Sequence, residues 1–354
     1  ITTKKPVLGE LFGKVQASYG QFASNDSDVS KATLELNIPL GETLAMRIAA
    51  IHDYSEGFYT NDKPPGGTVA CLACSPDGVP FESVVSDYPF AGDGSEIGGK
   101  NVTAAKVKLR YQPNDFYMAD FTLEILRDSS ETPAAANVTP EGEGFLWPLM
   151  GFPGIGNGDP FSTGQSYLNI PGVNLGDGHN VDTDGYYLTQ TFSLDNYTIK
   201  SITGYREQEE ILNSTYTGEA YTSLYDAARN SVRETFQQEF RLSSDLDGPL
   251  NYVVGAAYYT DDVDFNVFGR FGFLPLASAA AIFDDILQIQ ATDQERESYA
   301  FYIDGTYELS ESTRLSLGYR HTRDEKEFHR LDIGGAGGNP LSNFLFDLSQ
   351  ITGP

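Results

Sequence analysis

Apolar and polar residues alternate with a period of two in many short stretches of this chain. Between 117 and 125 every odd position is apolar or aromatic, and every even position except Met118 is polar. Such alternation is typical of β-strands with one apolar and one polar face. Weaker Tyr-rich segments complete the pattern, which predicts eleven strands, near 14–19, 32–38, 44–48, 105–111, 117–125, 186–194, 197–206, 236–242, 250–261, 299–307 and 315–319.

The connections between these strands alternate strictly between short and long. Short links rich in Pro, Gly, Asn, Asp and Ser fall at 39–42, 112–115, 195–196, 243–249 and 310–312. Long links fall at 54–101, 128–182, 208–231, 263–292 and from 327 onward, and the first link, near 23–29, is a short one on the long-loop side. A transmembrane β-barrel has this asymmetry, with short periplasmic turns, long extracellular loops and strands of about 9–11 residues. The predicted fold class is therefore all-β, an antiparallel transmembrane β-barrel; a large soluble all-β protein is the alternative.

The strand count bears on the domain organisation. Single-chain bacterial barrels have an even number of strands, and an open sheet edge is not viable in lipid. Eleven strands therefore predict that residues 1–354 form one partial barrel domain, the N-terminal half of a larger barrel. The alternative is that one strand is missed or counted in excess.

Composition excludes several classes of protein. The 50 acidic residues outnumber the 23 basic ones and give a net charge of −27, which disfavours nucleic acid as a partner. No run of about 18 apolar residues predicts a membrane helix, but period-two strands can face lipid while the average stays polar. The four histidines are scattered and no Gly-x-Ser-x-Gly motif occurs, so we expect no catalytic residues and no enzyme. Residues 1–6 contain neither an initiator Met nor the apolar core of a signal peptide.

Several segments together resemble the TonB-dependent outer-membrane receptors. They are Ile-Thr-Thr-Lys-Lys-Pro at 1–6 with Gly13-Lys14-Val15 and Ser18-Tyr19-Gly20, Leu36-Asn37-Ile38-Pro39-Leu40-Gly41 with Met46-Arg47-Ile48-Ala49, Gly57-Phe58-Tyr59-Thr60-Asn61, Ser201-Ile202-Thr203-Gly204-Tyr205-Arg206, Gln238-Glu239-Phe240-Arg241-Leu242-Ser243-Ser244 and Gly318-Tyr319-Arg320. The resemblance covers most strands and few loops. It implies a 22-stranded barrel filled by an N-terminal plug. The sequence departs from the family in showing no plug or coupling box before Ile1 and no second barrel half after Pro354.

The resemblance implies a function and a place in the cell. Receptors of this family lie in the outer membrane of Gram-negative bacteria, among outer-membrane lipid and lipopolysaccharide. A TonB-type energy transducer in the periplasm pulls on the plug to admit a bound small-molecule nutrient, typically a ferric siderophore, haem, cobalamin or glycan. We therefore expect an active importer of such a nutrient. The alternatives are a passive porin-type channel and a structural or adhesive barrel.

Two groups of side chains are candidates for binding the nutrient. The link 128–182 carries seven acids and no Lys or Arg, together with the exposed-aromatic candidates Trp147, Phe152 and Tyr167. These aromatics can instead pack the loop's own small core. An acidic loop repels an anionic cargo, which favours a neutral or cationic cargo or a site elsewhere. Strand alternation places Lys106, Lys108 and Arg110 in the lumen, where they either bind cargo or pair with acids of a plug.

Three further features concern the long links. Cys71 and Cys74 lie in an extracellular, oxidising link, which predicts a loop disulfide. Asn180, Asp182 and Asp184 before Gly185 match part of a calcium-loop spacing, but position 12 is Thr191 rather than Glu, so calcium is a weak candidate and we expect no other cofactor. Apolar residues recur at helical spacing in 274–291, which predicts a short helix in an external loop.

Overall fold

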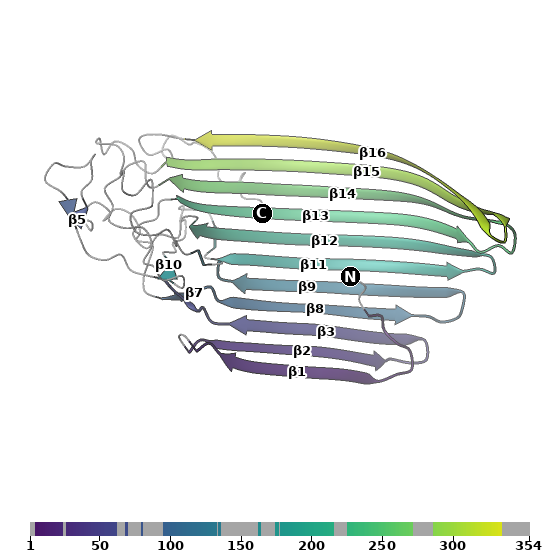
Figure 1. The fold of residues 1–354 in the computed structure, drawn as a ribbon, viewed down its shortest axis with the longest axis horizontal. Coiled ribbons are helices and arrows are strands. Elements are labelled where there is room, and N and C mark those ends of the chain that lie inside the picture. Colours follow the sequence, from purple (N-terminus) through teal and green to yellow (C-terminus); the bar gives the residue numbers. More distant parts are fainter. Residues whose placement is uncertain are drawn as a thin grey trace.

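Antiparallel strands make up most of the described residues (Figure 1). The structure is a computed structural model, and it describes residues 4–23, 26–61, 68–69, 79–80, 95–132, 134–135, 162–163, 174–176, 178–215, 225–271 and 286–334. One sheet contains eleven strands, which confirms the number predicted from the sequence. They are β1 (Phe12–Gln21), β2 (Asp28–Pro39), β3 (Leu44–Ser55), β8 (Lys100–Tyr111), β9 (Tyr117–Ser130), β11 (His179–Ser193), β12 (Tyr197–Thr215), β13 (Tyr225–Ser244), β14 (Leu250–Phe271), β15 (Ile286–Ser310) and β16 (Thr313–Gly334).

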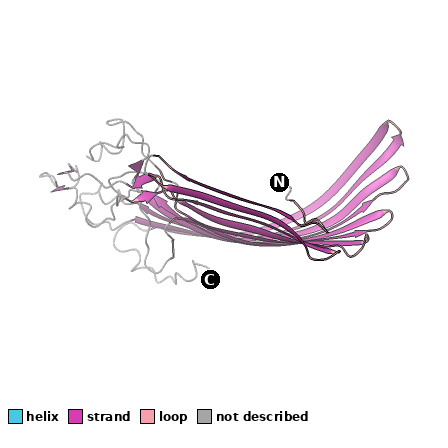
Figure 2. Cartoon of the chain, turned by 90° about the horizontal axis from the view of Figure 1, so that it is seen from below, coloured by secondary structure: helices cyan, strands magenta, loops and turns pink. Residues whose placement is uncertain are grey.

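Each strand of this sheet pairs with the next one along the chain. The order runs from β1 to β16 without a crossover, and β1 and β16 form its two edges. The sheet is strongly curved (Figure 2) and is not closed into a barrel. Short strands in the long links make two small sheets beside it, one of β4 (Tyr59–Asn61), β7 (Glu96–Ile97) and β10 (Ser162–Thr163) and one of β5 (Thr68–Val69) and β6 (Val79–Pro80). Among the described residues, no helix is long and apolar enough to cross a membrane.

One face of the sheet carries an apolar band that begins at the short turns. On β9 the band runs from Tyr117 to Ile125, and the first charged residue on that face is Arg127. On β11, β12 and β13 the first such charges are Asp184, Glu207 and Glu234, each about ten residues from its short turn. Ten residues of tilted strand are the length needed to cross a bilayer. This face therefore faces lipid, and the strands beyond the band lie outside the hydrocarbon.

Aromatic side chains border the band at both ends, as in transmembrane barrels. Near the short turns the ring centroids of Tyr117 and Phe192 are 5.1 Å apart, and those of Tyr111 and Tyr117 are 6.4 Å apart. At the other border, Tyr258 and Tyr299 lie 5.0 Å apart, and both hydroxyls donate to Oε1 of Glu297, at 2.7 and 2.5 Å. Their rings face the apolar band while their hydroxyls reach the first charged residue, which is the arrangement expected at a membrane surface.

Strand lengths and one loop differ from the sequence prediction. The strands after β9 reach 15 to 25 residues, well beyond the predicted 9–11, because pairing continues above the band. Several acids that fall in predicted long links, among them Glu209, Glu210 and Asp264, lie instead on these extensions. The helix predicted over 274–291 is wrong for residues 286–291, which belong to β15 and pair with β14; residues 272–285 lie outside the described part.

A row of carboxylates crosses six neighbouring strands on the lipid-side face, just above the apolar band. Its members occupy directly opposed register positions, in the order Asp184, Glu207, Glu234, Asp262, Glu295 and Glu327. Like charges at directly opposed positions destabilise a sheet. The Asp262 side chain is exposed, but partial desolvation raises the pKa of its carboxyl above the usual value, and the negative charge of Glu234 raises it further. Asp184 differs, because the Arg127 guanidinium binds it at 2.7 Å.

We expect Asp262→Asn to raise the free energy of unfolding at pH 7 by about 0.2–1 kcal/mol, the range of one cross-strand pair. The raised pKa means that the folded state binds this proton more tightly than the unfolded state, so the repulsion is relieved as the pH falls through the raised value. The difference in the free energy of unfolding between Asp262→Asn and wild type should therefore be smaller in denaturant titrations at pH 4. Asp184→Asn is the matched control, and it should lower stability because it breaks the pair with Arg127. Equal effects of the two variants would contradict this assignment.

Candidate functional site: the cationic inner wall

The face opposite the apolar band is charged. The segment that precedes β1 lies against this face, which identifies it as the inner one. Residues 4–10 precede β1 and lie on this face, in front of the sheet in Figure 1. Lys5 reaches Asp120 of β9 at 3.6 Å, and the Lys108 ammonium of β8 donates to the Lys4 carbonyl at 3.1 Å. The face that carries this segment is turned away from the lipid band, and we call it the inner wall.

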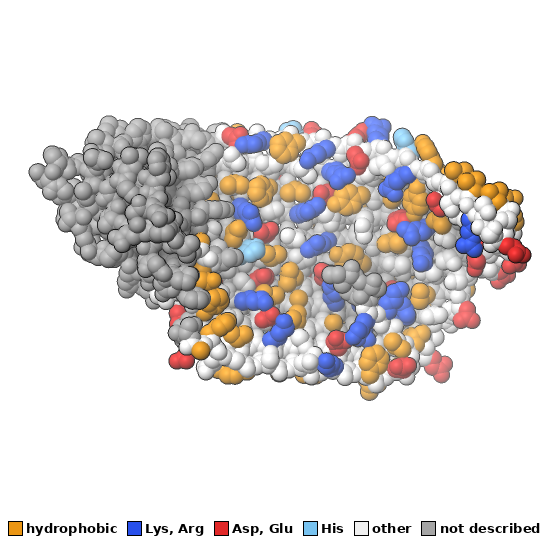
Figure 3. Space-filling model, viewed as in Figure 1, with side chains coloured by type: hydrophobic (Ala, Val, Ile, Leu, Met, Phe, Trp, Pro, Cys, Tyr) orange, Lys and Arg blue, Asp and Glu red, His pale blue; other side chains and the backbone are white. Residues whose placement is uncertain are grey.

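Basic side chains gather on the inner wall, although the chain as a whole is acidic (Figure 3). Among the strand residues whose side chains are described, only Arg127 and Arg323 are basic and point to the lipid-side face. The register places the other strand cations inside: Lys14, Lys31, Arg47, Lys100, Lys106, Lys108, Arg110, Lys200, Arg206, Arg229, Arg233, Arg241, Arg296, Arg314, Arg320, Lys326 and Arg330. Acids such as Asp53, Asp120 and Glu124 share this wall and pair with some of these cations. The cations outnumber the acids on this face, and an excess of positive charge attracts anions.

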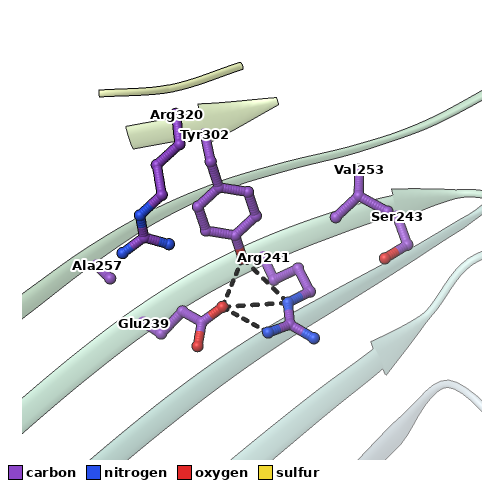
Figure 4. A pocket seen from close by; sticks show the side chains of 7 residues that line it. All are labelled: Glu239, Arg241, Ser243, Val253, Ala257, Tyr302 and Arg320. Carbon is purple, nitrogen blue, oxygen red and sulfur yellow. Dashed lines mark hydrogen bonds and ion pairs between the residues drawn. The ribbon is translucent and has the colours of Figure 1, made fainter. Parts of the chain in front are cut away.

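One part of the inner wall combines three cations with a tyrosine in a single row. Lys200, Arg241, Gly255, Tyr302 and Arg320 occupy successive register positions on β12 to β16. Arg241, Tyr302 and Arg320 line a cavity of about 450 Å³ together with Glu239 (Figure 4), and Lys200 stands opposite Arg241 in the register. We call Lys200, Arg241, Tyr302 and Arg320 the cationic row.

The two arginines of the row are held in different ways. Glu239 Oε1 accepts from Arg241 at 2.7 Å and from the Tyr302 hydroxyl at 2.5 Å, and Arg241 Nε also lies 3.1 Å from that hydroxyl. Arg320 lies over the Tyr302 ring, with its guanidinium carbon 5.7 Å from the ring centroid. Within the described residues, no carboxylate lies within ion-pair distance of Arg320. The planar guanidinium group of Arg320 therefore faces the cavity. Its paired N–H donors suit a carboxylate or another planar oxyanion.

Gly255 makes this arrangement of the tyrosine ring possible. A Cβ atom at residue 255 would lie 2.3 Å from both Cζ and the hydroxyl oxygen of Tyr302. Because glycine has no side chain, the ring can lie flat across β14 and bring its hydroxyl to Glu239 and Arg241. An aromatic ring laid over a glycine of the neighbouring strand is a recurrent device in sheets.

The three predicted lumen cations do lie on the inner wall, but described partners hold each of them. Lys106 pairs with Glu124 at 2.9 Å, and Arg110 binds Asp120 through two bonds of 2.7 and 2.9 Å. Lys108 donates to the backbone of the N-terminal segment. Their role in binding cargo stays a prediction, and the geometry offers the cationic row as the more open group.

The other predicted sites are distributed as follows. Trp147, Phe152, Tyr167, Cys71 and Cys74 lie outside the described residues. Asn180, Asp182 and Asp184 lie in the extended strand β11 and not in a loop, so the backbone does not wrap around an ion there as a calcium loop does. Both aspartates instead face Arg127, at 3.8 and 2.7 Å. In the described part of the chain, no group of three or more His, Cys, Asp or Glu side chains is placed to hold a metal ion.

Sequence reasoning did not single out the cationic row. Alternation did place Arg241, Tyr302 and Arg320 on the polar side of their strands. The row forms because the pairing of five successive strands, β12 to β16, brings these residues opposite one another. The alternation within a single strand does not indicate how that strand is aligned with its neighbours.

Comparisons with known proteins identify the class of fold. No family model and no curated protein matches the sequence. Among solved structures, the chain is similar to the ferric yersiniabactin uptake receptor FyuA from Yersinia pestis, with a TM-score of 0.60, 14% identity and coverage of 95% of this chain and 43% of that one. It is also similar to the unliganded ferric citrate transporter FecA, with a TM-score of 0.54, 10% identity and coverage of 95% and 42%.

The fold is that of a transmembrane β-barrel wall like those of these two proteins, which agrees with the fold that the sequence resemblance implies. The chain spans less than half the length of these two receptors. At this level of identity the likeness establishes the fold alone.

Proposed function

We propose that this chain forms part of the barrel wall of an outer-membrane receptor that imports an anionic nutrient, such as a ferric siderophore. A TonB-type transducer in the periplasm would supply the energy. One observation carries the proposal: an outer-membrane barrel wall, with a lipid face bordered by aromatic rings, directs nearly all its described cations inward. Cations on a lipid-facing surface would be costly, whereas on the inner wall they attract an anionic solute.

The cationic row gives the proposed cargo its chemistry. Carboxylates and other oxyanions of a chelator would bind the guanidinium group of Arg320, with the charges of Arg241 and Lys200 nearby. FyuA is a ferric yersiniabactin uptake receptor and FecA a ferric citrate transporter, which agrees with a cargo of this kind. The acidic link 128–182 disfavours an anion at the rim, which supports a binding site on the inner wall.

Uptake of a radiolabelled ferric complex tests the proposal. Cells that lack their own iron receptors and carry the complete protein containing this chain should accumulate the complex, and a protonophore should abolish the accumulation. Accumulation that survives the protonophore and follows the outside concentration would establish the passive channel instead. Absence of uptake for every anionic ferric complex offered would contradict an importer of this class.

A further inference from the structure

The side chain of Asn37 holds the N-terminal segment against the inner wall. Its Oδ1 accepts from the Val7 amide at 2.9 Å, while its Nδ2 donates to the carbonyls of Val7, at 2.9 Å, and Glu10, at 2.7 Å. Asn37 is fully buried, with 0% exposure. A buried amide that makes three hydrogen bonds to backbone acts on this segment as a neighbouring strand would.

Ion pairs add a second, weaker set of contacts. Lys4 lies 3.2 Å from Glu35, and Lys5 lies 3.6 Å from Asp120. The two lysine side chains are 73% and 61% exposed, so these pairs contribute little to holding the segment. Lys108 also donates one exposed hydrogen bond to the Lys4 carbonyl, at 3.1 Å. The buried amide of Asn37, with three hydrogen bonds, makes the largest set of contacts between residues 4–10 and the sheet.

The position of these contacts matters for β1. The segment runs directly into Phe12, the first residue of β1, and Phe12 stands opposite Asn37 in the register. Within this chain β1 pairs with β2 over ten residues, from Phe12 to Gln21. A pull on the chain before Lys4, directed into the lumen, would load the Phe12 end of β1 first and open its hydrogen bonds one after another. Asn37 transfers that load to β2, which is paired on both sides, before it reaches Phe12.

We propose that Asn37 is an anchoring residue, which protects β1 from being peeled from the wall when the chain on its N-terminal side is pulled. The proposal rests on the proposed function in one respect, because energised import is what would supply such a pull. It assigns to Asn37 a mechanical task that its three hydrogen bonds perform and that a residue buried only for packing would not.

Single-molecule pulling tests the anchor directly. The complete protein is held in a lipid nanodisc, with Cys71 and Cys74 replaced by serine and a handle attached through Thr2→Cys. The wild-type wall should give a first force peak that releases the eight residues from Lys4 to Leu11, about 25–30 Å of chain, before β1 yields. Asn37→Asp, which has nearly the same shape but cannot donate to the two carbonyls, should lose the first peak. Asn37→Ser, which is too short to reach the segment, should lose it as well.

Controls separate the anchor from a general loss of structure. Thr33 lies on the same face of β2 as Asn37, so the Thr33→Val variant should keep both force peaks. Every variant should also keep the heat-modifiable electrophoretic migration of a folded barrel. A first peak that persists in the folded Asn37 variants, or that is missing from the wild type, would overturn the proposal. Pulling requires neither cargo nor an energy source, so this outcome is independent of the uptake experiment. In cells that import the cargo, Asn37→Asp should lower uptake while cargo binding stays unchanged.

Discussion

Replacing Leu188 with arginine is expected to lower the free energy of unfolding by about 2–4 kcal/mol, the cost of a cation near the middle of the bilayer on the lipid face of a barrel. Leu188 stands opposite Phe121 on β9, and on its own strand it lies midway between Phe192 near the short turn and Asp184, the first charged residue on this face. The large effect arises because the guanidinium must leave water for hydrocarbon or distort the bilayer to keep its hydration.

The neighbouring Thr189 provides the matched control. It follows Leu188 in the strand, stands opposite Asp120 and points to the inner wall. Thr189→Arg places the same charge in a polar lumen near a carboxylate, so its effect should stay within about 0.5 kcal/mol, as for most exposed substitutions. Denaturant unfolding of the complete protein in lipid vesicles measures the free energy of unfolding of both variants. Equal losses for the two variants would mean that the two faces of the sheet do not differ as assigned.

Neutralising the cationic row should have the second large effect, on binding of the cargo. Arg320→Gln removes a guanidinium fork that no described carboxylate occupies. A hydrogen bond to a charged group is worth about 1.5–3 kcal/mol, so an anionic ferric complex should bind about ten- to a hundredfold more weakly. Adding Lys200→Gln and Arg241→Gln should weaken binding further. The affinity for a neutral ferric complex should fall much less, because these substitutions act by removing positive charge.

Arg323→Gln is the control for this prediction. Arg323 belongs to the same strand as Arg320 but points to the lipid-side face, where it pairs with Glu325. Calorimetric titration of the purified protein in detergent should therefore give unchanged affinity for this variant. An Arg320→Gln protein that binds the anionic complex as tightly as wild type, or an equal loss from Arg323→Gln, would exclude the row as the cargo site.

Strand number and face assignment were predictable from sequence, because both depend on a local period. Every odd residue from Tyr117 to Ile125 is apolar or aromatic, and these residues form the lipid band of β9. The same alternation placed Lys106, Lys108 and Arg110 inside, where the register has them. A β-barrel suits such reasoning because each strand shows its two environments in its own sequence.

Features that depend on long-range pairing were not predictable. The extensions of β12 to β16 beyond the membrane carry charges on both faces, so no amphipathic signal identifies them as strands. Residues 286–291 have apolar spacing that suits a helix, yet pairing with β14 makes them strand, since tertiary pairing overrides local propensity. The cationic row and the carboxylate row each require the register of several hairpins, and Asn37 gives no signal of its contacts to residues 4–10.

The central claim is that this sheet is a barrel wall with lipid on one face and a polar lumen on the other. Spin labels placed one at a time at each position from Tyr117 to Ile125 of the complete protein in lipid vesicles test it most directly. Odd positions should be relaxed by oxygen, which dissolves in lipid, and even positions by a water-soluble nickel complex, with a strict period of two. Accessibility without this period, or with the two phases exchanged, would contradict the account.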